Sequence, residues 1–549
     1  MRYTESKSYQ YHQLTKHTLQ SLLSTKHRLD WATQPDPFRI YDGAETLELP
    51  RQIQFDEIGM FELIERTHAL QGLQKPEKSK PCTLESLSNL LFYSLAISAW
   101  KQIRGTDERW ALRVNPSSGN LHPTECHLLV NGFDGIEDGA YHYRVKDHLL
   151  EKRAAGNVLA RVWKHLSSED DRPAPPAMLC LSSIFWREAW KYRDRAFRYC
   201  QLDLGHASAA ACLAAGNLGW STRVIAEFAD ETLAKFLGLQ GSDEKLMVLI
   251  PLYSAGADRE SSMSTPHSEV QSAFAGNPNQ LSSSQVKYES IQEVYQATCL
   301  SEPEYQSRQE SLNAPARRFI EPPDGAEKID LKEVYYQPQE QAIAANVIRT
   351  RRSAVDMDGQ LRISLARMSR IIIDSSRGFA SSYSGVLPFQ AAEFAQPFFI
   401  HIILYVHRVD GIASGVYYFD RAGLHLSCLN ETNVQTYAKF ASCLQDIASD
   451  GVFAVCLIAD MQSAFEVFGE RAYRYVHQEA GFIGHLFYLT AHALGIDATG
   501  IGCFIDDEIN RSMPPGMEVV YNFTFGRATV DSRLSSLPAY DFINPSIPG

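Results

Sequence analysis

Apolar runs alternate along the chain with helical stretches and polar, turn-rich segments, a pattern typical of a mixed α and β protein. Runs rich in Val, Ile, Leu and Phe predict six strands, at residues 127–130, 178–184, 245–252, 398–409, 452–460 and 519–525. Two further stretches, 204–218 and 484–494, carry apolar or small residues on nearly every face, which predicts helices buried on all sides. We therefore expect two strand-rich cores with these helices packed centrally.

The chain repeats itself at one fixed interval. Residues 195–199 read RAFRY and residues 471–475 read RAYRY, and 471 − 195 = 276. The same offset relates Gly139-Ala-Tyr-His-Tyr143 to Gly415-Val-Tyr-Tyr-Phe419. It also holds for Gly205 and Gly481, Leu218 and Leu494, Gly219 and Gly495, Phe228 and Phe504, and Asp230 and Asp506. A register this long indicates an internal duplication.

Length and local composition suggest where the duplicated units begin and end. At 549 residues the chain can form two sizeable domains, which we place at residues 85–257 and 339–549. Residues 258–338 are rich in Ser, Gln, Glu, Asn and Pro and are expected to form a polar linker with short helical pieces. Residues 1–84 are expected to form an N-terminal extension. Neither segment suggests chemistry of its own.

Composition and charge exclude several classes of protein. A formal charge of −13 disfavours a nucleic-acid partner, and no apolar run approaches the roughly 20 residues that span a bilayer. The polar N-terminal residues lack a secretory signal, so we expect a cytoplasmic protein without a membrane partner. The ten cysteines occur singly, without a CxxC pair or zinc-type Cys/His spacing, which predicts reduced thiols and no metal site.

Three motifs contain the candidate residues for cofactor binding and proton transfer. They are Arg113-Val-Asn-Pro-Ser-Ser-Gly-Asn-Leu-His-Pro123, then Trp190-Lys-Tyr-Arg-Asp-Arg-Ala-Phe-Arg-Tyr199 followed by Asp203-Leu-Gly-His206, and Arg349-Thr-Arg-Arg-Ser353 with Gly500-Ile-Gly-Cys-Phe504 and Gly526-Arg527. In this order they resemble the nitroreductase superfamily, especially azoline dehydrogenases of the SagB and cyanobactin-oxidase type. The resemblance covers roughly residues 85–255 and 340–530.

That resemblance implies a fold and a cofactor. The fold is α+β, with a mixed, mainly antiparallel sheet flanked by helices in each domain. The family binds FMN between the two subunits of a dimer, so two fused domains here would form an intrachain pseudo-dimer with both sides of the site in one chain. Whether such chains pair further is left open.

FMN needs cationic donors for its phosphate and an apolar slot for its ring. We expect the phosphate at Arg349, Arg351, Arg352 and Ser353, at the start of a helix whose free N–H groups assist, with Arg527 closing the site. Val355 stands where the family often has a second basic residue. The backbone of Gly500, Ile501 and Gly502 is expected to approach the ring. Contacts from the other half are expected from Pro116, Ser117, Ser118, Gly119 and Asn120.

The two halves are not equivalent, which predicts one composite site rather than two. At the 276-residue offset, Gly500 and Gly502 correspond to Val224 and Ala226. The Pro-Ser turn is represented in the second half only by the degenerate Ser382-Tyr-Ser-Gly-Val386. Lys191 and Tyr192 correspond to Val467 and Phe468, which cannot transfer protons.

The resemblance makes Lys191 and Tyr192 the acid/base pair, and a base at neutral pH would need a lowered pKa. The same two residues could instead cap a helix through ion pairs with Glu188 or Asp194. The expected protein is an enzyme, an FMN-dependent dehydrogenase or oxidase that moves hydride between a small or peptide-borne substrate and flavin. An NAD(P)H-dependent reductase of nitro compounds or quinones and a flavin-binding scaffold without turnover remain alternatives.

Overall fold

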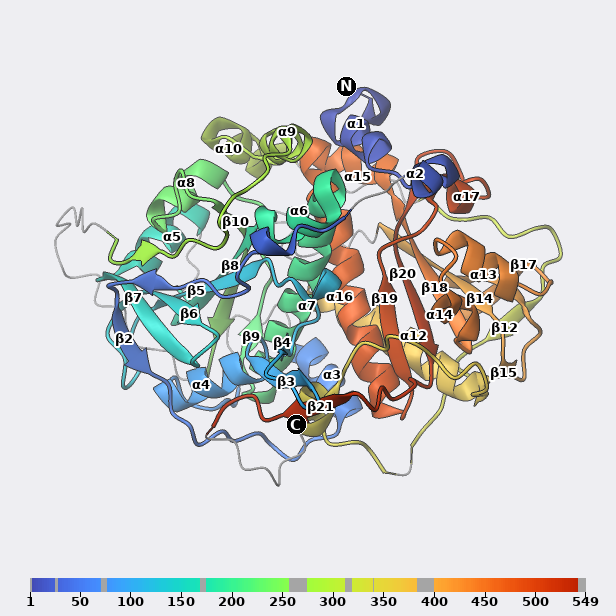
Figure 1. The fold of residues 1–549 in the computed structure, drawn as a ribbon, viewed down its shortest axis with the longest axis horizontal. Coiled ribbons are helices and arrows are strands. Elements are labelled where there is room, and N and C mark those ends of the chain that lie inside the picture. Colours follow the sequence, from blue (N-terminus) through green and yellow to red (C-terminus); the bar gives the residue numbers. More distant parts are fainter. Residues whose placement is uncertain are drawn as a thin grey trace.

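The computed structural model describes residues 2–24, 28–70, 77–167, 174–255, 274–311, 318–338, 340–382 and 399–541. Two seven-stranded sheets lie on either side of a central pair of helices, α7 (Ala196–Asn217) and α16 (Ala472–Ala493) (Figure 1). The degenerate turn predicted at 382–386 lies outside the described residues beyond Ser382. No helix within the described ranges is long and apolar enough to span a membrane.

The two sheets have the same strand order, and all their strand pairings are antiparallel. The first runs β2 (Glu45–Glu48), β7 (Leu149–Ala155), β6 (Gly139–Arg144), β5 (Thr124–Val130), β8 (Ala177–Ile184), β10 (Glu244–Tyr253) and β9 (Ser221–Thr222). The second runs β12 (Lys328–Asp330), β17 (His425–Asn430), β16 (Gly415–Asp420), β14 (Ile400–Val406), β18 (Phe453–Asp460), β20 (Met517–Gly526) and β19 (Asp497–Ile501). This correspondence confirms the α+β class and the duplication.

The helices α7 and α16 cross where both carry a glycine. A Cβ on Gly205 would lie 2.1 Å from the Gln478 carbonyl oxygen, and one on Gly481 would lie 2.0 Å from that of Leu202. Only glycine lets the two backbones approach this closely. Every residue of α7 and nearly every residue of α16 is buried, so the predicted central packing is confirmed.

The two halves are joined by reciprocal ion pairs from the repeated motif. Arg195 and Arg198 of the first half bind Asp506 of the second, and Arg471 and Arg474 of the second bind Asp230 of the first. All six side chains are buried. The RAFRY and RAYRY segments therefore hold the halves together.

The N-terminal extension and the polar linker each contribute an equivalent helix, α1 (Lys7–Leu14) and α9 (Glu289–Thr298). Arg198 donates to the His12 carbonyl, and Arg474 donates to the Tyr295 carbonyl in the same way. Figure 1 shows α9 near α1 at the end of the central helices. The short helical pieces predicted for the linker are present, and they belong to the repeat.

The remaining helices surround the sheets and the central pair (Figure 1). They are α2 (Leu19–Ser24), α3 (Met60–Leu70), α4 (Leu84–Phe92), α5 (Val158–Ser167), α6 (Phe185–Tyr192), α8 (Asp230–Phe236), α10 (Glu302–Ser311), α11 (Ala344–Thr350), α12 (Leu365–Ser382), α13 (Gln435–Ala441), α14 (Asp446–Asp450), α15 (Met461–Phe468) and α17 (Asp506–Asn510).

A third sheet ties the C-terminal segment to the first half. Strand β21 (Leu534–Leu537) pairs with β3 (Ile97–Ile103), which pairs with β4 (Arg109–Arg113). Beyond β21, the Tyr540 hydroxyl donates to the Val145 carbonyl at 2.7 Å and accepts from the Ile97 N–H at 3.0 Å. The sequence did not predict this pairing of the C-terminal segment with the first half.

Candidate functional site

The arginine-rich segment follows a helix and does not begin one. Helix α11 ends at Thr350, and Arg351 is its C-terminal cap with ψ 131°. The prediction that free N–H groups of a helix face the phosphate here is therefore wrong. The apolar positions that form the helix precede the arginines, so the guanidinium groups and Ser353 are the donors that this segment offers.

Three arginines gather here without a carboxylate partner among the described residues. Arg349 donates to the carbonyls of Phe92 at 3.1 Å and Ile97 at 2.9 Å and lies 3.9 Å from the Phe92 ring centroid. Arg352 donates to the carbonyls of Arg349 and Arg351. Arg349 thus has the contacts of a structural residue, and its predicted role as a cofactor ligand stays a prediction.

Arg351 is the arginine whose donors are free. Its side chain is buried, and within the described parts of the chain its Nε and Nη1 have no hydrogen-bond partner. Its Nη2 lies 3.5 Å from the carbonyl oxygen of Arg113, in the first half. Burial lowers the pKa of Arg351, and burial with the charges of Arg351 and Arg349 lowers the pKa of Arg352 to about 9. A buried cation without a counterion is unfavourable, so this arrangement favours an anion.

Ser353 and Lys101 are two further candidate phosphate-binding residues at the arginine segment. The Ser353 hydroxyl hydrogen-bonds the Tyr488 hydroxyl at 2.9 Å, and the Gly500 N–H donates to the same hydroxyl at 2.8 Å. Burial and the charge of Arg352 lower the pKa of Lys101, which donates to Ser536 at 2.8 Å. Lys101 was missed in the sequence because tertiary packing alone brings β3 to the arginines. It adds a cation that Val355, with its side chain at the surface, cannot supply.

Gly500 and Gly502 make room for tyrosines of the protein itself. A Cβ on Gly500 would lie 2.1 Å from the Tyr521 hydroxyl, and one on Gly502 would lie 2.4 Å from a ring carbon of Tyr199. Tyr199 also donates to the Gly502 carbonyl at 2.9 Å. The side chain of Ile501 is buried in the core of the second sheet. Contact of this backbone with a flavin ring therefore stays a prediction.

The side chain of Arg527 lies at the surface and points to another partner. Its side chain is 64% exposed and pairs with Asp358 at 3.6 Å. No contact joins it to the arginine segment among the described residues, so its predicted role as a phosphate ligand is untested.

The predicted Pro-Ser turn and the Lys-Tyr pair do come together. Gly119 lies in the short helix η3 (Ser118–Asn120) with φ 60°. A Cβ there would lie 2.6 Å from the Tyr192 hydroxyl and 3.0 Å from Lys191 Nζ. Asn120 donates to the Ala111 carbonyl at 2.9 Å, and Pro116 is buried beneath the turn. The turn thus presents its backbone to the two candidate acid/base residues.

Two buried carboxyl groups hold this turn. Asp203 accepts from the Ser118 N–H at 3.1 Å and its hydroxyl at 3.0 Å, and Ser117 lies 3.5 Å from Glu188. Burial raises the pKa of Asp203 to about 7, and burial and Asp203 raise the pKa of Glu188.

Burial and the charge of Glu188 also raise the pKa of Tyr192. The expectation of a lowered pKa is therefore wrong for Tyr192, which keeps its proton and can donate it. Glu188 forms no ion pair with Lys191 in the described structure, and Asp194 accepts instead from Ser290.

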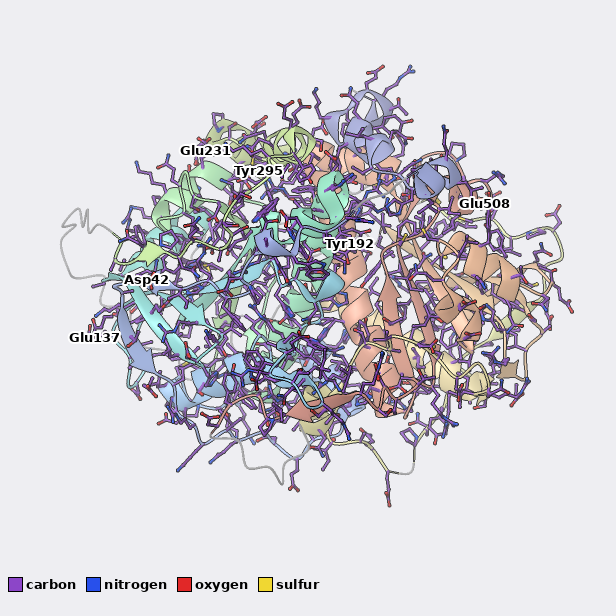
Figure 2. All side chains as sticks on the ribbon, in the orientation of Figure 1. Asp42, Glu137, Tyr192, Glu231, Tyr295 and Glu508 are labelled. Carbon is purple, nitrogen blue, oxygen red and sulfur yellow. The ribbon has the colours of Figure 1, made fainter. Side chains whose placement is uncertain are left out.

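Aromatic residues connect the arginine segment with the Lys191–Tyr192 pair. The Tyr192 and Tyr199 rings are 4.5 Å apart, and Tyr521 hydrogen-bonds His206 of α7 at 3.1 Å. Burial raises the pKa of Tyr521, and Tyr488, Asp203, Tyr199 and Tyr192 add to that effect. Figure 2 shows Tyr192 near the middle of the molecule, where the halves meet. Residues from both halves therefore converge, as a composite site requires.

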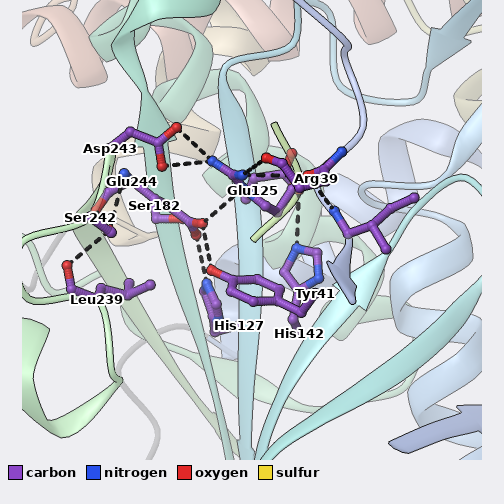
Figure 3. Close-up of polar contacts among 12 residues, drawn as sticks. Arg39, Tyr41, Glu125, His127, His142, Ser182, Leu239, Ser242, Asp243 and Glu244 are labelled. Carbon is purple, nitrogen blue, oxygen red and sulfur yellow. Dashed lines mark hydrogen bonds and ion pairs between the residues drawn. The ribbon is translucent and has the colours of Figure 1, made fainter. Parts of the chain in front are cut away.

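Figure 3 shows a buried polar network on the strands of the first sheet that includes Glu125, His142 and Glu244. Arg187 of α6 donates to the His122 carbonyl at 2.8 Å and to Glu125, which also contacts His142. Glu244 accepts from Tyr41 at 2.9 Å and lies 2.6 Å from His127. The carboxylates in this network are paired, so we interpret it as a rigid support that also anchors the N-terminal segment.

This architecture, two antiparallel sheets around a helix pair with polar groups of both halves converging, defines the nitroreductase-like fold. A crystal structure from Anabaena variabilis, of a chain described as a nitroreductase, superposes with a TM-score of 0.72 at 22% sequence identity. The match covers 95% of this chain and 100% of that one, so the likeness includes both halves.

The sequence comparisons agree. Residues 106–252 match the model of the Nitroreductase family. The protein MJ1384 of Methanocaldococcus jannaschii, named as a nitroreductase, is 27% identical over 178 residues, which are 32% of this chain and 82% of that protein.

Two relatives bear the names of processing proteins. The trifolitoxin-processing protein TfxB of Rhizobium leguminosarum bv. trifolii is 31% identical over 153 residues, 27% of this chain and 41% of TfxB. The microcin B17-processing protein McbC of Escherichia coli is 28% identical over 182 residues, 32% of this chain and 65% of McbC. The matches thus span less than two thirds of each processing protein.

Proposed function

We propose that this chain is an FMN-dependent dehydrogenase or oxidase of the SagB type, acting on a small or peptide-borne substrate with one flavin held between its halves. The observation that carries the proposal is Arg351, a buried guanidinium that, within the described residues, has two unpartnered nitrogens and no carboxylate beside it. Bound FMN would supply the group that accepts or donates hydride.

The donor set fits a phosphate. Arg351 offers free donors, Ser353 offers a hydroxyl, and Arg352 and Lys101 add positive charge. A guanidinium can contact two phosphate oxygens at once, which is the geometry that distinguishes arginine from lysine. Because no acidic side chain in the described parts of the chain neutralises these cations, a dianion would gain from the whole set.

At the other end, Lys191 and Tyr192 would manage the proton that accompanies hydride transfer. Tyr192 holds its proton at the hydroxyl because its pKa is raised, so it can donate. Lys191 would take the complementary role, with its Nζ as the atom that accepts the proton. Asp203 and Glu188 position the turn that faces both residues.

The peptide-borne substrate is supported by the relatives TfxB and McbC, which are named for processing trifolitoxin and microcin B17. An azoline-containing peptide is therefore the first substrate to test.

The test begins with the chain purified without added cofactor. Its visible spectrum and the flavin released by acid should give about one FMN per chain, and Lys191→Ala should keep that flavin but lose azoline oxidation. Full turnover by Lys191→Ala would refute the acid/base assignment. A colourless protein that also rejects added FMN would refute the cofactor. Rapid bleaching by NADPH in Lys191→Ala would support a nitro or quinone reductase, and a flavin that neither NADPH nor an azoline peptide reduces would support a scaffold.

A further inference from the structure

Three soft metal donors meet on the second half of the molecule. His17, Cys443 and Cys503 each offer one ligand atom, and these atoms all lie within 4.8 Å of one another. They come from the segment between α1 and α2, the end of α13 and the residue after Gly502. Their separation along the chain explains why no zinc-type spacing appears in the sequence.

Hydrogen bonds bring these segments together. The Ile505 N–H donates to the Ala441 carbonyl at 2.8 Å, and the Gln445 amide donates to the Cys503 carbonyl at 3.2 Å. The His17 N–H donates to Asp506 at 2.9 Å, and the Asp506 N–H donates to the His17 carbonyl at 3.3 Å. The donors are therefore fixed by structure that does not depend on a ligand.

The geometry matches an edge of a zinc tetrahedron. Zn–S bonds of about 2.3 Å and Zn–N bonds of about 2.0–2.1 Å place sulfur and nitrogen about 3.6 Å apart around a tetrahedral ion. Cys503 Sγ lies 3.6 Å from His17 Nδ1. A thiolate pair with an imidazole is a donor set that favours zinc over hard cations.

The backbone at Cys443 is strained in a way that fits a ligand. Cys443 and Leu444 have φ of 55° and 62°, in the left-handed region that residues with a Cβ seldom adopt. Strain of this kind persists where surrounding structure enforces it, often at functional sites.

The duplication supplies an internal comparison. At the offset of 276, Ser167 corresponds to Cys443 and Glu227 to Cys503. Leu300 occupies the place of His17, because it forms the same two hydrogen bonds with Asp230, one to the carboxylate and one from the backbone N–H, that His17 forms with Asp506. That half folds with Ser, Glu and Leu at these positions, so the fold does not require the His, Cys, Cys set.

We infer that His17, Cys443 and Cys503 form a Zn²⁺ site with three protein ligands and a fourth position for water. Binding would deprotonate the two cysteine thiols and join the N-terminal segment to α13 and to the strand that ends at the proposed flavin site. The inference stands independently of the proposed function, because it uses none of the acid/base or phosphate residues.

The test uses the full chain, kept reduced, stripped of metal with a chelator and then titrated with Zn²⁺ against a coloured competitor. One tightly held Zn²⁺ per chain is expected, and His17→Ala, Cys443→Ser and Cys503→Ser should each weaken binding by about tenfold or more. Cys428→Ser is the matched control, because Cys428 is a free, half-buried thiol outside the cluster. It should bind Zn²⁺ like the unaltered chain.

A second measurement keeps the inference testable if a variant fails to fold. Co²⁺ added to the unaltered, stripped chain should give the intense visible bands of a tetrahedral ion and the ultraviolet bands of thiolate ligation. Failure to retain Zn²⁺, octahedral Co²⁺ without thiolate bands, or equal loss in Cys428→Ser would overturn the inference. So would a Cys443–Cys503 disulfide as the resting form in non-reducing mass spectrometry.

Discussion

At the scale of single residues, Arg351 differs from its neighbours in what its guanidinium contacts. Arg349 and Arg352 bind backbone carbonyls, whereas Arg351 keeps Nε and Nη1 unpartnered among the described residues. A charge-assisted hydrogen bond contributes about 1.5–3 kcal/mol, so Arg351→Ala should raise the Kd for FMN by about 10- to 150-fold. Arg351→Lys should restore only part of the affinity, because lysine lacks the two-pronged geometry.

Fluorescence titration measures this effect, and two controls isolate the phosphate. Riboflavin lacks the phosphate, so its affinity should be the same in Arg351→Ala and the unaltered chain. Arg527→Ala removes an exposed side chain whose ion pair with Asp358 is weak, and it should change the Kd for FMN by less than about threefold. Equal losses for FMN and riboflavin would mean that Arg351 acts on the fold.

Asp203 gives a prediction about pH. Its folded pKa of about 7 lies above the unfolded value of about 3.9, so its contribution to stability is fully present below about pH 4. That contribution is lost as the pH rises through 7. Asp203→Asn lacks this loss, so the free energy of unfolding of the unaltered chain should fall relative to the variant, by up to about 4 kcal/mol between pH 4 and pH 8. Urea unfolding at several pH values measures it, and parallel curves for the two proteins would contradict it.

At the scale of elements, the reciprocal Arg–Asp contacts at the starts of α7 and α16 carry the symmetry of the duplication. Asp230→Ala leaves Arg471 and Arg474 buried without a counterion, which should cost about 3–5 kcal/mol of unfolding free energy. Asp506→Ala should cost a similar amount for the same reason.

Denaturant unfolding measures both variants. Asp410→Ala is the control, because the Asp410–Arg362 pair is more than half exposed on both sides and should contribute about 1 kcal/mol or less. If Asp230→Ala proved no more damaging than Asp410→Ala, the ion pairs would not hold the halves together.

The elements also show what a sequence pattern can and cannot predict. The six predicted strands correspond to β5, β8, β10, β14, β18 and β20, the apolar central strands of each sheet. Strand β7 contains polar residues that pair with other side chains, and β21 has the sequence Leu-Ser-Ser-Leu and forms a strand only by pairing with β3. Neither strand has the apolar run on which the sequence prediction depends. The Pro-Ser turn was found from its motif, but Lys101 and Tyr521 join the site only through tertiary packing.

At the scale of the whole molecule, the duplication places both sides of the proposed site in one chain. A site shared between separate subunits weakens when dilution separates them. Here the segment before Arg351 contacts the first half through Arg349, and β21 extends a first-half sheet. The affinity for FMN should therefore be independent of protein concentration.

The number of flavins follows from the asymmetry of the halves. Val224, Ala226 and Phe468 stand in the second, mirrored position, and all three are buried. Val224 and Ala226 carry a Cβ where Gly500 and Gly502 are proposed to allow close backbone approach, and Phe468 lacks the hydroxyl that is proposed as the proton donor at Tyr192. Calorimetric titration at two protein concentrations about a hundredfold apart should give the same Kd and one FMN per chain. Two flavins per chain would show that the mirrored position also binds, and a Kd that rises on dilution would show that the site lies between chains.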